Sequence, residues 1–297
     1  MQKLPAIAVL YCAIALSSAS PALAWGTAAH RIIAGIAEKH LTPQAASNVR
    51  ILLQGKTLAD VASWADELRA HRNEPGYDGR FANSFTGSGH FVDIPRTADA
   101  YDAHRDCARG DCIVAQVDRF SHILGDTNIS GDDDRADALR FLVNLIGDVH
   151  DPLHCINDGD MAGNRVEMVF FGKKTNLHIV WDIGLLEHTH IDTSTYIDRL
   201  NGRLRDFDRF ADGTPADWAT QSHRIARDIA YVIPTGPDAS QRYYEASLRP
   251  VEDQLMYAGA RLARTLNQLI GGAPVPPPLN PPLLNPPPQK TTLQQPV

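Results

Sequence analysis

The segment Phe141–His154, FLVNLIGDVHDPLH, places aspartates and histidines inside otherwise apolar sequence. Its apolar residues recur at three- and four-residue steps, the period of a helix. Buried charges must be paired or bound to a metal, because desolvating them unpaired costs several kcal/mol. Pro152 removes a backbone donor, so we expect the helix to bend or end near it and to bring His154 back toward Asp148.

The same period continues through most of the chain and predicts further helices within 30–41, 42–53, 58–71, 112–124, 217–233 and 251–270. The one clear strand signal is RVEMVFFG, residues 165–172, followed by a GKKTN turn that could close a short hairpin. We therefore predict an all-α fold, a single mostly helical domain with a short β-hairpin.

Both ends of the chain differ in composition from the middle. Residues 1–24 contain Lys3, an apolar run and an Ala-x-Ala site, which is typical of a signal peptide, and the run is too short for a membrane anchor. Cleavage would expose Trp25 in a periplasmic or secreted protein. Residues 272–297 are rich in proline, which predicts a disordered tail, with a ligand for a proline-binding partner as the alternative. Residues 25–271 form the predicted domain.

The net charge of the chain limits how it could bind a polyanionic substrate. The chain has 28 basic and 35 acidic residues, whereas a protein that holds nucleic acid through basic side chains alone is usually basic. A polyanionic substrate would have to be attracted by something else, such as a bound metal.

Cys107 and Cys112 are close enough for a disulfide, which an exported protein can keep. Cys155, beside His154, is either a buried free thiol or a thiolate ligand.

Several potential metal ligands lie within apolar sequence. His178 and Asp182 are four residues apart, so on a helix both project from one face, and such a pair commonly holds zinc or another borderline cation. Asn144 and Asp148 have the same spacing. The full candidate set is Trp25, His30, Asp66, His90, Asp148, His154, His178 and Asp182. His150 is a candidate hydrogen-bond partner of His154. We interpret the other histidines as structural or surface residues: His40, His71, His104, His122, His188, His190 and His223.

Six motifs follow one another in order between residues 25 and 182: WGTAAHRIIAGIAE, SWADELR, HFVDIP, LIGDVHDPLH, GDMAGNRVEMVFFG and NLHIVWD. Together they resemble the zinc-dependent single-strand-specific nucleases, the class I family typified by mung bean nuclease. The resemblance covers nearly all of residues 25–270. It implies a mostly helical domain with a trinuclear zinc cluster at the bottom of a cleft. It also implies cleavage of RNA and single-stranded DNA to 5′-phosphorylated products, often with 3′-nucleotidase activity.

The resemblance also implies roles for individual residues. The family's first zinc site matches Asp66, His90, Asp148 and the position of Asn144. The second site matches His154, His178 and Asp182. The third site matches the amine and carbonyl of Trp25 with His30, and Asp148 bridges the third site to the first. Asp66 would also orient or deprotonate the attacking water, and Arg69 would stabilise the transition state. Phe91 matches a base-stacking aromatic residue, and Asp93 matches a carboxylate that reads the base edge. The pair Cys107 and Cys112 resembles a family disulfide.

Asn144 departs from the family pattern, which usually has a histidine ligand there. An amide oxygen is a neutral, hard donor that suits zinc less well than imidazole does. The first site would then bind zinc more weakly, prefer Ca²⁺, Mg²⁺ or Mn²⁺, or recruit a water; alternatively, the remaining ligands suffice. Because every other ligand position matches, an active enzyme with altered metal preference is favoured over an inactive one.

Two other functions are compatible with the sequence. A zinc-dependent phospholipase C shares the implied fold and an N-terminal Trp ligand, but Phe91 and Asp93 favour a nucleotide over a lipid headgroup. A periplasmic metal-binding protein with a decayed site is the second, suggested by Asn144. The expected partners are single-stranded DNA, RNA and nucleotides, with no stable membrane association, and a monomer is expected.

Overall fold

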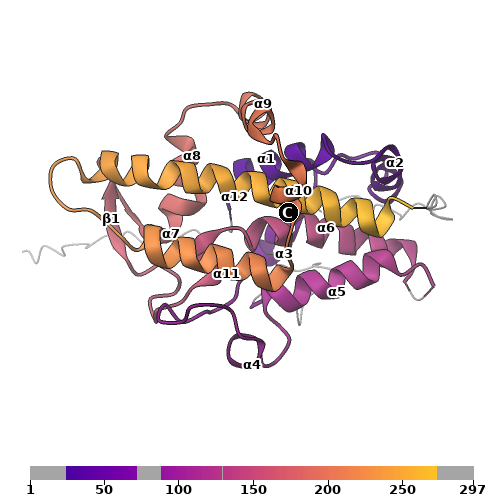
Figure 1. The fold of residues 1–297 in the computed structure, drawn as a ribbon, viewed down its shortest axis with the longest axis horizontal. Coiled ribbons are helices and arrows are strands. Elements are labelled where there is room, and N and C mark those ends of the chain that lie inside the picture. The colour runs from indigo at the N-terminus through magenta and orange to yellow at the C-terminus, as the bar shows by residue number, and fades with distance from the viewer. Residues whose placement is uncertain (1–24, 72–87, 129, 273–297) are drawn as a thin grey trace, which may run out of the picture.

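The structure is a computed structural model that describes residues 25–71, 88–128 and 130–272. The predicted signal peptide and nearly all of the proline-rich tail lie outside the described residues. The described chain is mostly helical, and its one sheet has two strands, which confirms the predicted fold class (Figure 1).

The C-terminal helix α12, Ala239–Ile270, runs along the long axis of the molecule (Figure 1). Helix α1, Thr27–Glu38, packs against it at Gly259, where a Cβ atom would lie only 2.6 Å from Ile36 Cγ2. The sequence predicted this helix from residue 251, but the helix begins twelve residues earlier and passes through Pro250. Burial of Tyr243 and Ser247 explains the difference, because packing outweighs the one backbone donor that proline removes.

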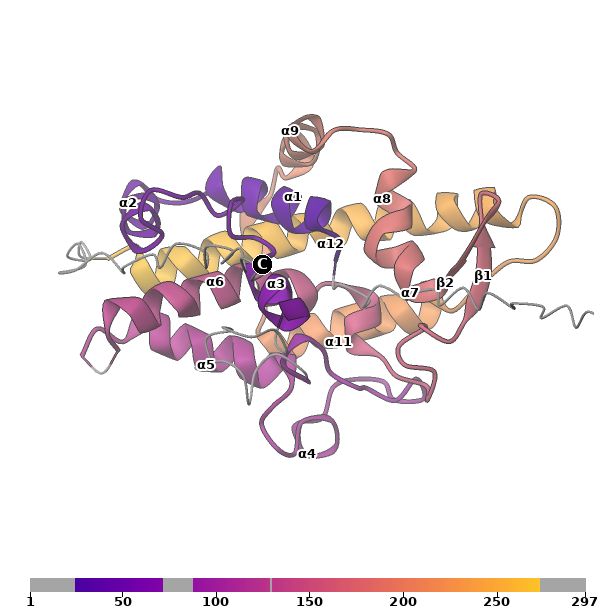
Figure 2. The same ribbon diagram turned by 180° about the vertical axis from the view of Figure 1, so that it is seen from behind.

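Helix α6, Asp132–Asp148, is the central helix, and nearly all of its residues from Arg135 onward are buried. It packs against α5, Ile113–Gly125, and also contacts α2, Pro43–Leu52, and α3, Trp64–His71 (Figure 2). Its polar C-terminal residues are therefore held inside the molecule, where only strong interactions compensate their lost hydration.

Five further helical segments belong to the described chain. They are α4, Ala103–Asp106; α9, Thr193–Arg203; α10, Phe207–Ala211; α11, Pro215–Ile225, and its continuation η5, Ala226–Ala230. The sequence analysis did not predict α9 and α10, which bury few residues: Tyr196 and Leu200 in α9, and Ala211 in α10. Asp192 caps α9 through its side chain, and Thr214 with Asp217 forms a capping box at α11.

Strands β1, Glu167–Phe170, and β2, Lys173–Asn176, form an antiparallel hairpin. The predicted hairpin is present, but the expected GKKTN turn is wrong, because Lys173–Asn176 is itself a strand. The turn is Phe171–Gly172, with φ values of 45° and 81°, and glycine adopts such values without steric cost. The chain then continues through α7, Leu177–Ile179, η4, Val180–Gly184, and α8, Leu185–Glu187.

Cysteine pairing agrees with the sequence prediction. Cys107 and Cys112 form a disulfide, whereas Cys155 is a buried free thiol. Burial raises the pKa of Cys155 well above its usual value, and its Sγ lies 3.4 Å from the Val149 carbonyl oxygen. Among the described residues, no helix is long and apolar enough to cross a membrane.

Candidate metal centre

The stretch around Pro152 divides into a helix end and a separate short turn. Helix α6 ends at Asp148, and Asp151 then caps the 3₁₀ turn η3, Pro152–Cys155, by accepting a hydrogen bond from Leu153 N at 2.8 Å. Pro152 occupies the first position of this turn, where its missing donor costs little. The predicted helix end is thus present, and it directs Asp148 and His154 into two neighbouring clusters.

The first cluster surrounds the Asp148 carboxylate. His30 Nε2 lies 3.2 Å from Asp148 Oδ1 and 3.5 Å from Asp66 Oδ2. His90 Nδ1 lies 2.7 Å from Asp148 Oδ2 and 3.6 Å from Asp66 Oδ1. All four side chains are buried, and they come from α1, α3, η2 (Ser88–His90) and α6.

Electrostatics in this cluster keep Asp148 ionised. Burial alone would raise the pKa of Asp148, but hydrogen bonds from His30 and His90 hold it well below its usual range. Burial lowers the pKa of His30, yet the hydrogen bond and charge of Asp148 outweigh burial, so the net pKa is raised. Burial and the nearby Asp148 charge raise the pKa of Asp66. A permanently charged carboxylate between two histidines is a strong anchor for a cation.

Gly147 permits this arrangement. A Cβ atom at Gly147 would lie 2.7 Å from His30 Nδ1, closer than carbon and nitrogen can approach. Any larger residue at this position would push the imidazole away from Asp148.

The second cluster contains His154, His178 and Asp182. His154 Nδ1 donates to the His90 carbonyl at 2.7 Å, and His178 Nδ1 donates to the Ala162 carbonyl at 2.7 Å. These bonds fix the tautomer of each ring and leave Nε2 as the atom that can ligate a metal. His178 Nε2 lies 3.3 Å from Asp182 Oδ2. Burial lowers the pKa of His154 to about 3 and that of His178 to about 4, so both rings are neutral at pH 7.

Asp151 is a buried carboxyl group that the sequence analysis overlooked. It is in direct contact with Asp182, and burial raises the pKa of Asp151 to about 7. Burial, followed by the charge of Asp151, raises the pKa of Asp182 well above its usual value. Because these folded-state pKa values exceed those of the unfolded chain, the metal-free fold binds protons that the unfolded chain releases. Its stability therefore falls as the pH rises through 7.

Several polar atoms of these clusters are buried without a hydrogen-bond partner among the described residues. They include His30 Nδ1, Asp66 Oδ1, His90 Nε2, Asn144 Oδ1 and Asp182 Oδ1. Such concentrated unsatisfied polarity costs folding free energy unless a ligand compensates it. Two buried triads, His30–Asp66–Asp148 and His154–His178–Asp182, have ligand atoms close enough to hold an ion. Their nitrogen and carboxylate donors suit zinc or a similar divalent cation.

Asn144 is completely buried at the edge of the first cluster. Its Nδ2 donates to Asp66 Oδ2 at 2.8 Å and to the Ala62 carbonyl at 3.1 Å. The Ala62 carbonyl oxygen can only accept a hydrogen bond, so it fixes which end of the Asn144 amide faces it. Asn144 therefore presents its NH₂ group to Asp66. Turning its oxygen toward Asp66 would place two oxygens against each other at Ala62.

Trp25 lies beside the second cluster. Its side chain is buried, and the next residue, Gly26, donates a backbone hydrogen bond to the Asp182 carbonyl at 2.8 Å. Helix α1 begins immediately afterwards and carries His30 to Asp148. The N-terminal end of the described chain is thereby held between the two clusters.

Residues 90–94 run alongside η3 and position two further predicted residues. Val92 N donates to the His154 carbonyl at 2.8 Å, and Asn157 N donates to the Ile94 carbonyl at 3.1 Å. In this extended segment Val92 and Ile94 are buried, so Phe91 and Asp93 point to the opposite side. There they line a pocket of about 240 Å³ with Arg69, His154, Asn157, Met161, Asn164 and His178.

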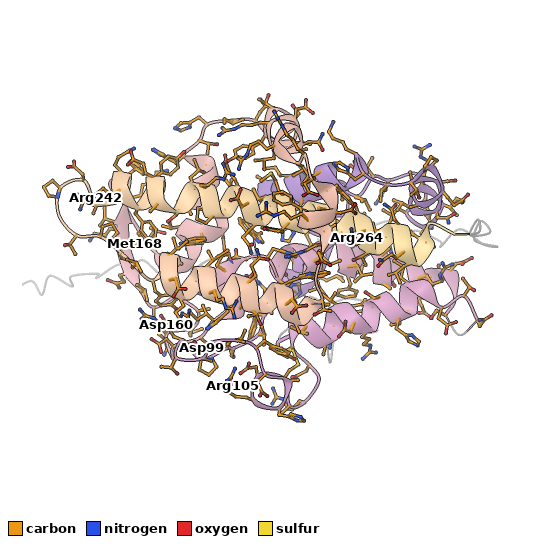
Figure 3. The ribbon with its side chains drawn as sticks, in the orientation of Figure 1. Asp99, Arg105, Asp160, Met168, Arg242 and Arg264 are labelled. Atoms are coloured by element: carbon orange, nitrogen blue, oxygen red, sulfur yellow. A yellow bond between two sulfur atoms is a disulfide. The ribbon has the colours of Figure 1, made fainter. Side chains whose placement is uncertain are left out.

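The loop between η3 and β1 closes this pocket. Asp160, labelled in Figure 3, accepts hydrogen bonds from Tyr231 Oη at 2.8 Å and from Gly163 N at 3.1 Å. Met161 and Ala162 have φ values of 58° and 54°, and this left-handed backbone directs the Ala162 carbonyl to His178. Asn157, Met161 and Asn164 were not predicted as site residues. Met161 and Asn164 lie within the matched motif GDMAGNRVEMVFFG and Asn157 lies just before it, but no spacing of residue types marks the three as pocket residues.

Other histidines lie away from both triads. His150 is not a hydrogen-bond partner of His154, contrary to the prediction. Its Nδ1 lies 2.6 Å from the Ile146 carbonyl oxygen and its Nε2 lies 2.7 Å from Arg261 Nη1, so both ring nitrogens already have other partners. His223 lies between the Cys155 and Ala98 carbonyls and has the expected structural role. Among the described residues, neither triad includes Cys155.

Comparison with known proteins places this centre in a family. A family model described as S1/P1 Nuclease matches residues 25–271. The chain belongs to the S1/P1 nuclease family. Nuclease P1 of Penicillium citrinum is 28% identical over 278 residues, covering 83% of this chain and 98% of that protein. Nuclease S1 of Aspergillus oryzae is 29% identical, covering 87% and 98%, and Endonuclease 3 of Arabidopsis thaliana is 29% identical, covering 84% and 90%.

Family membership makes the protein a nuclease, a hydrolase that acts on phosphodiester bonds. All the relatives reported above are named nucleases, so the phospholipase C alternative has no support among them. Among the described residues, the two buried triads and the pocket beside them bring together groups that could support such chemistry.

Proposed function

We propose that this nuclease is a metal-dependent enzyme specific for single strands, which hydrolyses RNA and single-stranded DNA to 5′-phosphorylated products and removes phosphate from 3′-nucleotides. The observation that carries this proposal is that His154 and His178 belong to a buried triad and also line the pocket of Phe91 and Asp93. A phosphate bound at the triad would therefore have its base next to these two side chains.

Up to three zinc ions are the proposed cofactors. Asp66, His90 and Asp148 would hold the first, and His154, His178 and Asp182 the second. His30 and the amine and carbonyl of Trp25 would hold the third, with Asp148 bridging. When bound, such cations supply Lewis acidity toward phosphate oxygens and lower the pKa of water.

Asn144 gives the first site a different character. Its NH₂ group faces Asp66, which leaves that site with fewer protein ligands than a histidine would provide. We propose that this site binds zinc weakly or accepts Ca²⁺, Mg²⁺ or Mn²⁺, with solvent completing the coordination.

Two residues of the chain act on the substrate itself. Asp66 is proposed to orient or deprotonate the attacking water, because its buried carboxylate lies in the first cluster one helical turn before Arg69 of the pocket. Arg69 lies one helical turn after Asp66 and lines the pocket. Its guanidinium would neutralise charge that develops on the phosphate oxygens and on the departing 3′ oxygen.

Preference for single strands would follow from Phe91. Its ring stands on the pocket wall beside Asp93, so a base has to enter the pocket to stack on it. A base paired within a duplex is not free to do so, whereas an unpaired base is.

The test combines elemental analysis with activity. Purified protein would be assayed on single-stranded DNA, duplex DNA, RNA and 3′-nucleotides after reconstitution with Zn²⁺, Ca²⁺, Mg²⁺ or Mn²⁺. We expect metal-dependent cleavage of single strands, with 5′-phosphate ends identified by mass spectrometry. Absence of cleavage with every cation would overturn the proposal and favour a metal-binding protein. Release of choline phosphate from phosphatidylcholine without DNA cleavage would favour a phospholipase.

The proposed role of Trp25 requires export and processing. An amine can ligate a metal only after residues 1–24 are removed, which is consistent with a periplasmic or secreted enzyme. We also propose that the enzyme is a monomer. Protein with residues retained before Trp25 should bind one zinc fewer than protein that begins at Trp25. Equal zinc content in the two forms would exclude the amine as a ligand.

A further inference from the structure

Asn157 holds the carboxylate of Asp93 at the mouth of the pocket. Its Nδ2 donates to Asp93 Oδ1 at 3.0 Å, and its own Oδ1 accepts from Gly159 N at 2.9 Å. Because the backbone N–H can only donate, the second bond settles which end of the amide faces Asp93. The donor to Asp93 is therefore fixed by the local turn.

Backbone contacts hold Asn157 and Asp93 in a fixed position relative to each other. Asn157 N donates to the Ile94 carbonyl at 3.1 Å, and Pro95 pairs with Asn157 as an isolated parallel bridge. The Asn157 amide thus has little freedom relative to Asp93. Among the described residues, Asp93 Oδ2 accepts no hydrogen bond, and Asp93 is exposed to the pocket.

The chemistry of this pair selects among bases. Burial raises the pKa of Asp93, and the hydrogen bond from Asn157 acts in the opposite direction, which favours the ionised form. An ionised carboxylate accepts hydrogen bonds and donates none. On the pairing edges of the four bases, only guanine presents two adjacent N–H donors, whereas uracil places carbonyl oxygens on both sides of its single N–H.

We propose that Asn157 is a positioning residue that orients the Asp93 carboxylate to accept both donors of a guanine base, so that the nuclease prefers guanine in this pocket. The inference rests on the proposed function, because it assigns a base preference to the same pocket. Each oxygen of Asp93 can accept more than one hydrogen bond, so the bond from Asn157 leaves the outward edge of the carboxylate open.

Asn157→Asp is the most selective variant for a test. Its side chain keeps an oxygen to accept from Gly159 N, but it replaces the donor to Asp93 with a second carboxylate. In the wild type we expect kcat/KM for GpG to exceed that for UpU roughly tenfold or more. In Asn157→Asp this ratio should fall about tenfold, because the variant loses a hydrogen bond to a charged group. Asn128→Asp, in the exposed turn after α5, introduces the same charge elsewhere and should retain the wild-type ratio.

A second variant separates positioning from structural support. Asp93→Asn/Asn157→Asp restores a donor and an acceptor between the two positions but moves the carboxylate away from the base. The double variant should regain thermal stability without regaining the guanine preference. Recovery of the preference in the double variant, an unchanged ratio in Asn157→Asp, or no preference in the wild type would each overturn the inference.

Binding provides a readout that does not depend on catalysis. Calorimetric titration with guanosine and uridine monophosphates compares the two bases with the phosphate held constant. If the wild type cleaves no nucleic acid, the proposed function fails, and these titrations alone decide the role of Asn157. Tighter binding of the guanine nucleotide that is lost in Asn157→Asp supports it, and equal binding of both nucleotides refutes it.

Discussion

Replacing Asn144 with histidine tests how the first cluster holds its cation. In the metal-free protein the change removes the bond from Nδ2 to Asp66, at 2.8 Å, and the bond to the Ala62 carbonyl, at 3.1 Å. A hydrogen bond to a charged group contributes about 1.5–3 kcal/mol and a neutral one about 1 kcal/mol. The chelator-treated variant should thus be less stable by about 2–4 kcal/mol.

With zinc present, the change should have the opposite sign. The imidazole of a histidine offers a nitrogen ligand that suits zinc, whereas the Asn144 amide presents its NH₂ group to the cluster. We expect the affinity for zinc to rise about tenfold, which corresponds to about 1.4 kcal/mol. Ligand binding to the folded state raises its apparent stability. The difference in melting temperature between zinc-loaded and chelator-treated protein should therefore be larger for Asn144→His than for the wild type.

The assay is zinc content after dialysis against a weak competing chelator, with thermal unfolding of the same samples. Asn144→Leu is the matched control, because it removes the amide without supplying a ligand and should not retain more zinc than the wild type. Equal zinc retention and equal melting shifts in Asn144→His and the wild type would refute the idea that Asn144 weakens the first site.

Three further outcomes are expected. Gly147→Ala should displace His30 and reduce bound zinc by one ion, and unchanged metal content would contradict the close contact seen here. Arg69→Ala should lower kcat about 10²-fold or more with full zinc content, whereas an effect on KM alone would exclude transition-state stabilisation. Metal-free protein should lose about 1 kcal/mol of stability from pH 6.5 to 8 in chemical denaturation, because Asp151, whose folded-state pKa is about 7, must then ionise; Asp151→Asn should reduce this slope.

Helical periodicity predicted the elements that have a continuous apolar stripe, and α6 is the clearest case because nearly all of its C-terminal half is buried. Helices α9 and α10 have few buried residues, so their sequences carry a weak periodic signal. The start of α12 at Ala239 was missed for another reason. Packing of Tyr243 stabilises helix on both sides of Pro250, and no local rule contains that long-range contact.

Site residues could be predicted from the sequence where a polar side chain interrupts an apolar segment. His30, Asp148 and Asp182 stand out in this way, and the fold brings His30 and Asp148 into one triad and Asp182 into the other. Asp151 also lies in an apolar segment, but its contact with Asp182 depends on the turn at η3. The Asn157–Asp93 bond depends on two segments, far apart in the sequence, that pair through their backbones. Such a pairing leaves no periodic signal in either segment.

The acidic composition of the chain is compatible with a polyanionic substrate because the charge that matters is local. Asp148 carries a buried negative charge, and Asp66, Asp151 and Asp182 add carboxyl groups that can lose their protons to a bound cation, in a centre where neither water nor basic side chains screen charge well. That field would repel phosphate in the metal-free protein, yet the same field attracts divalent cations. If three divalent ions bind as proposed, their positive charge exceeds the negative charge of the four carboxylates, and loading the centre would reverse the sign of the potential at the pocket. Substrate binding should thus depend on metal occupancy more strongly than on any surface lysine or arginine.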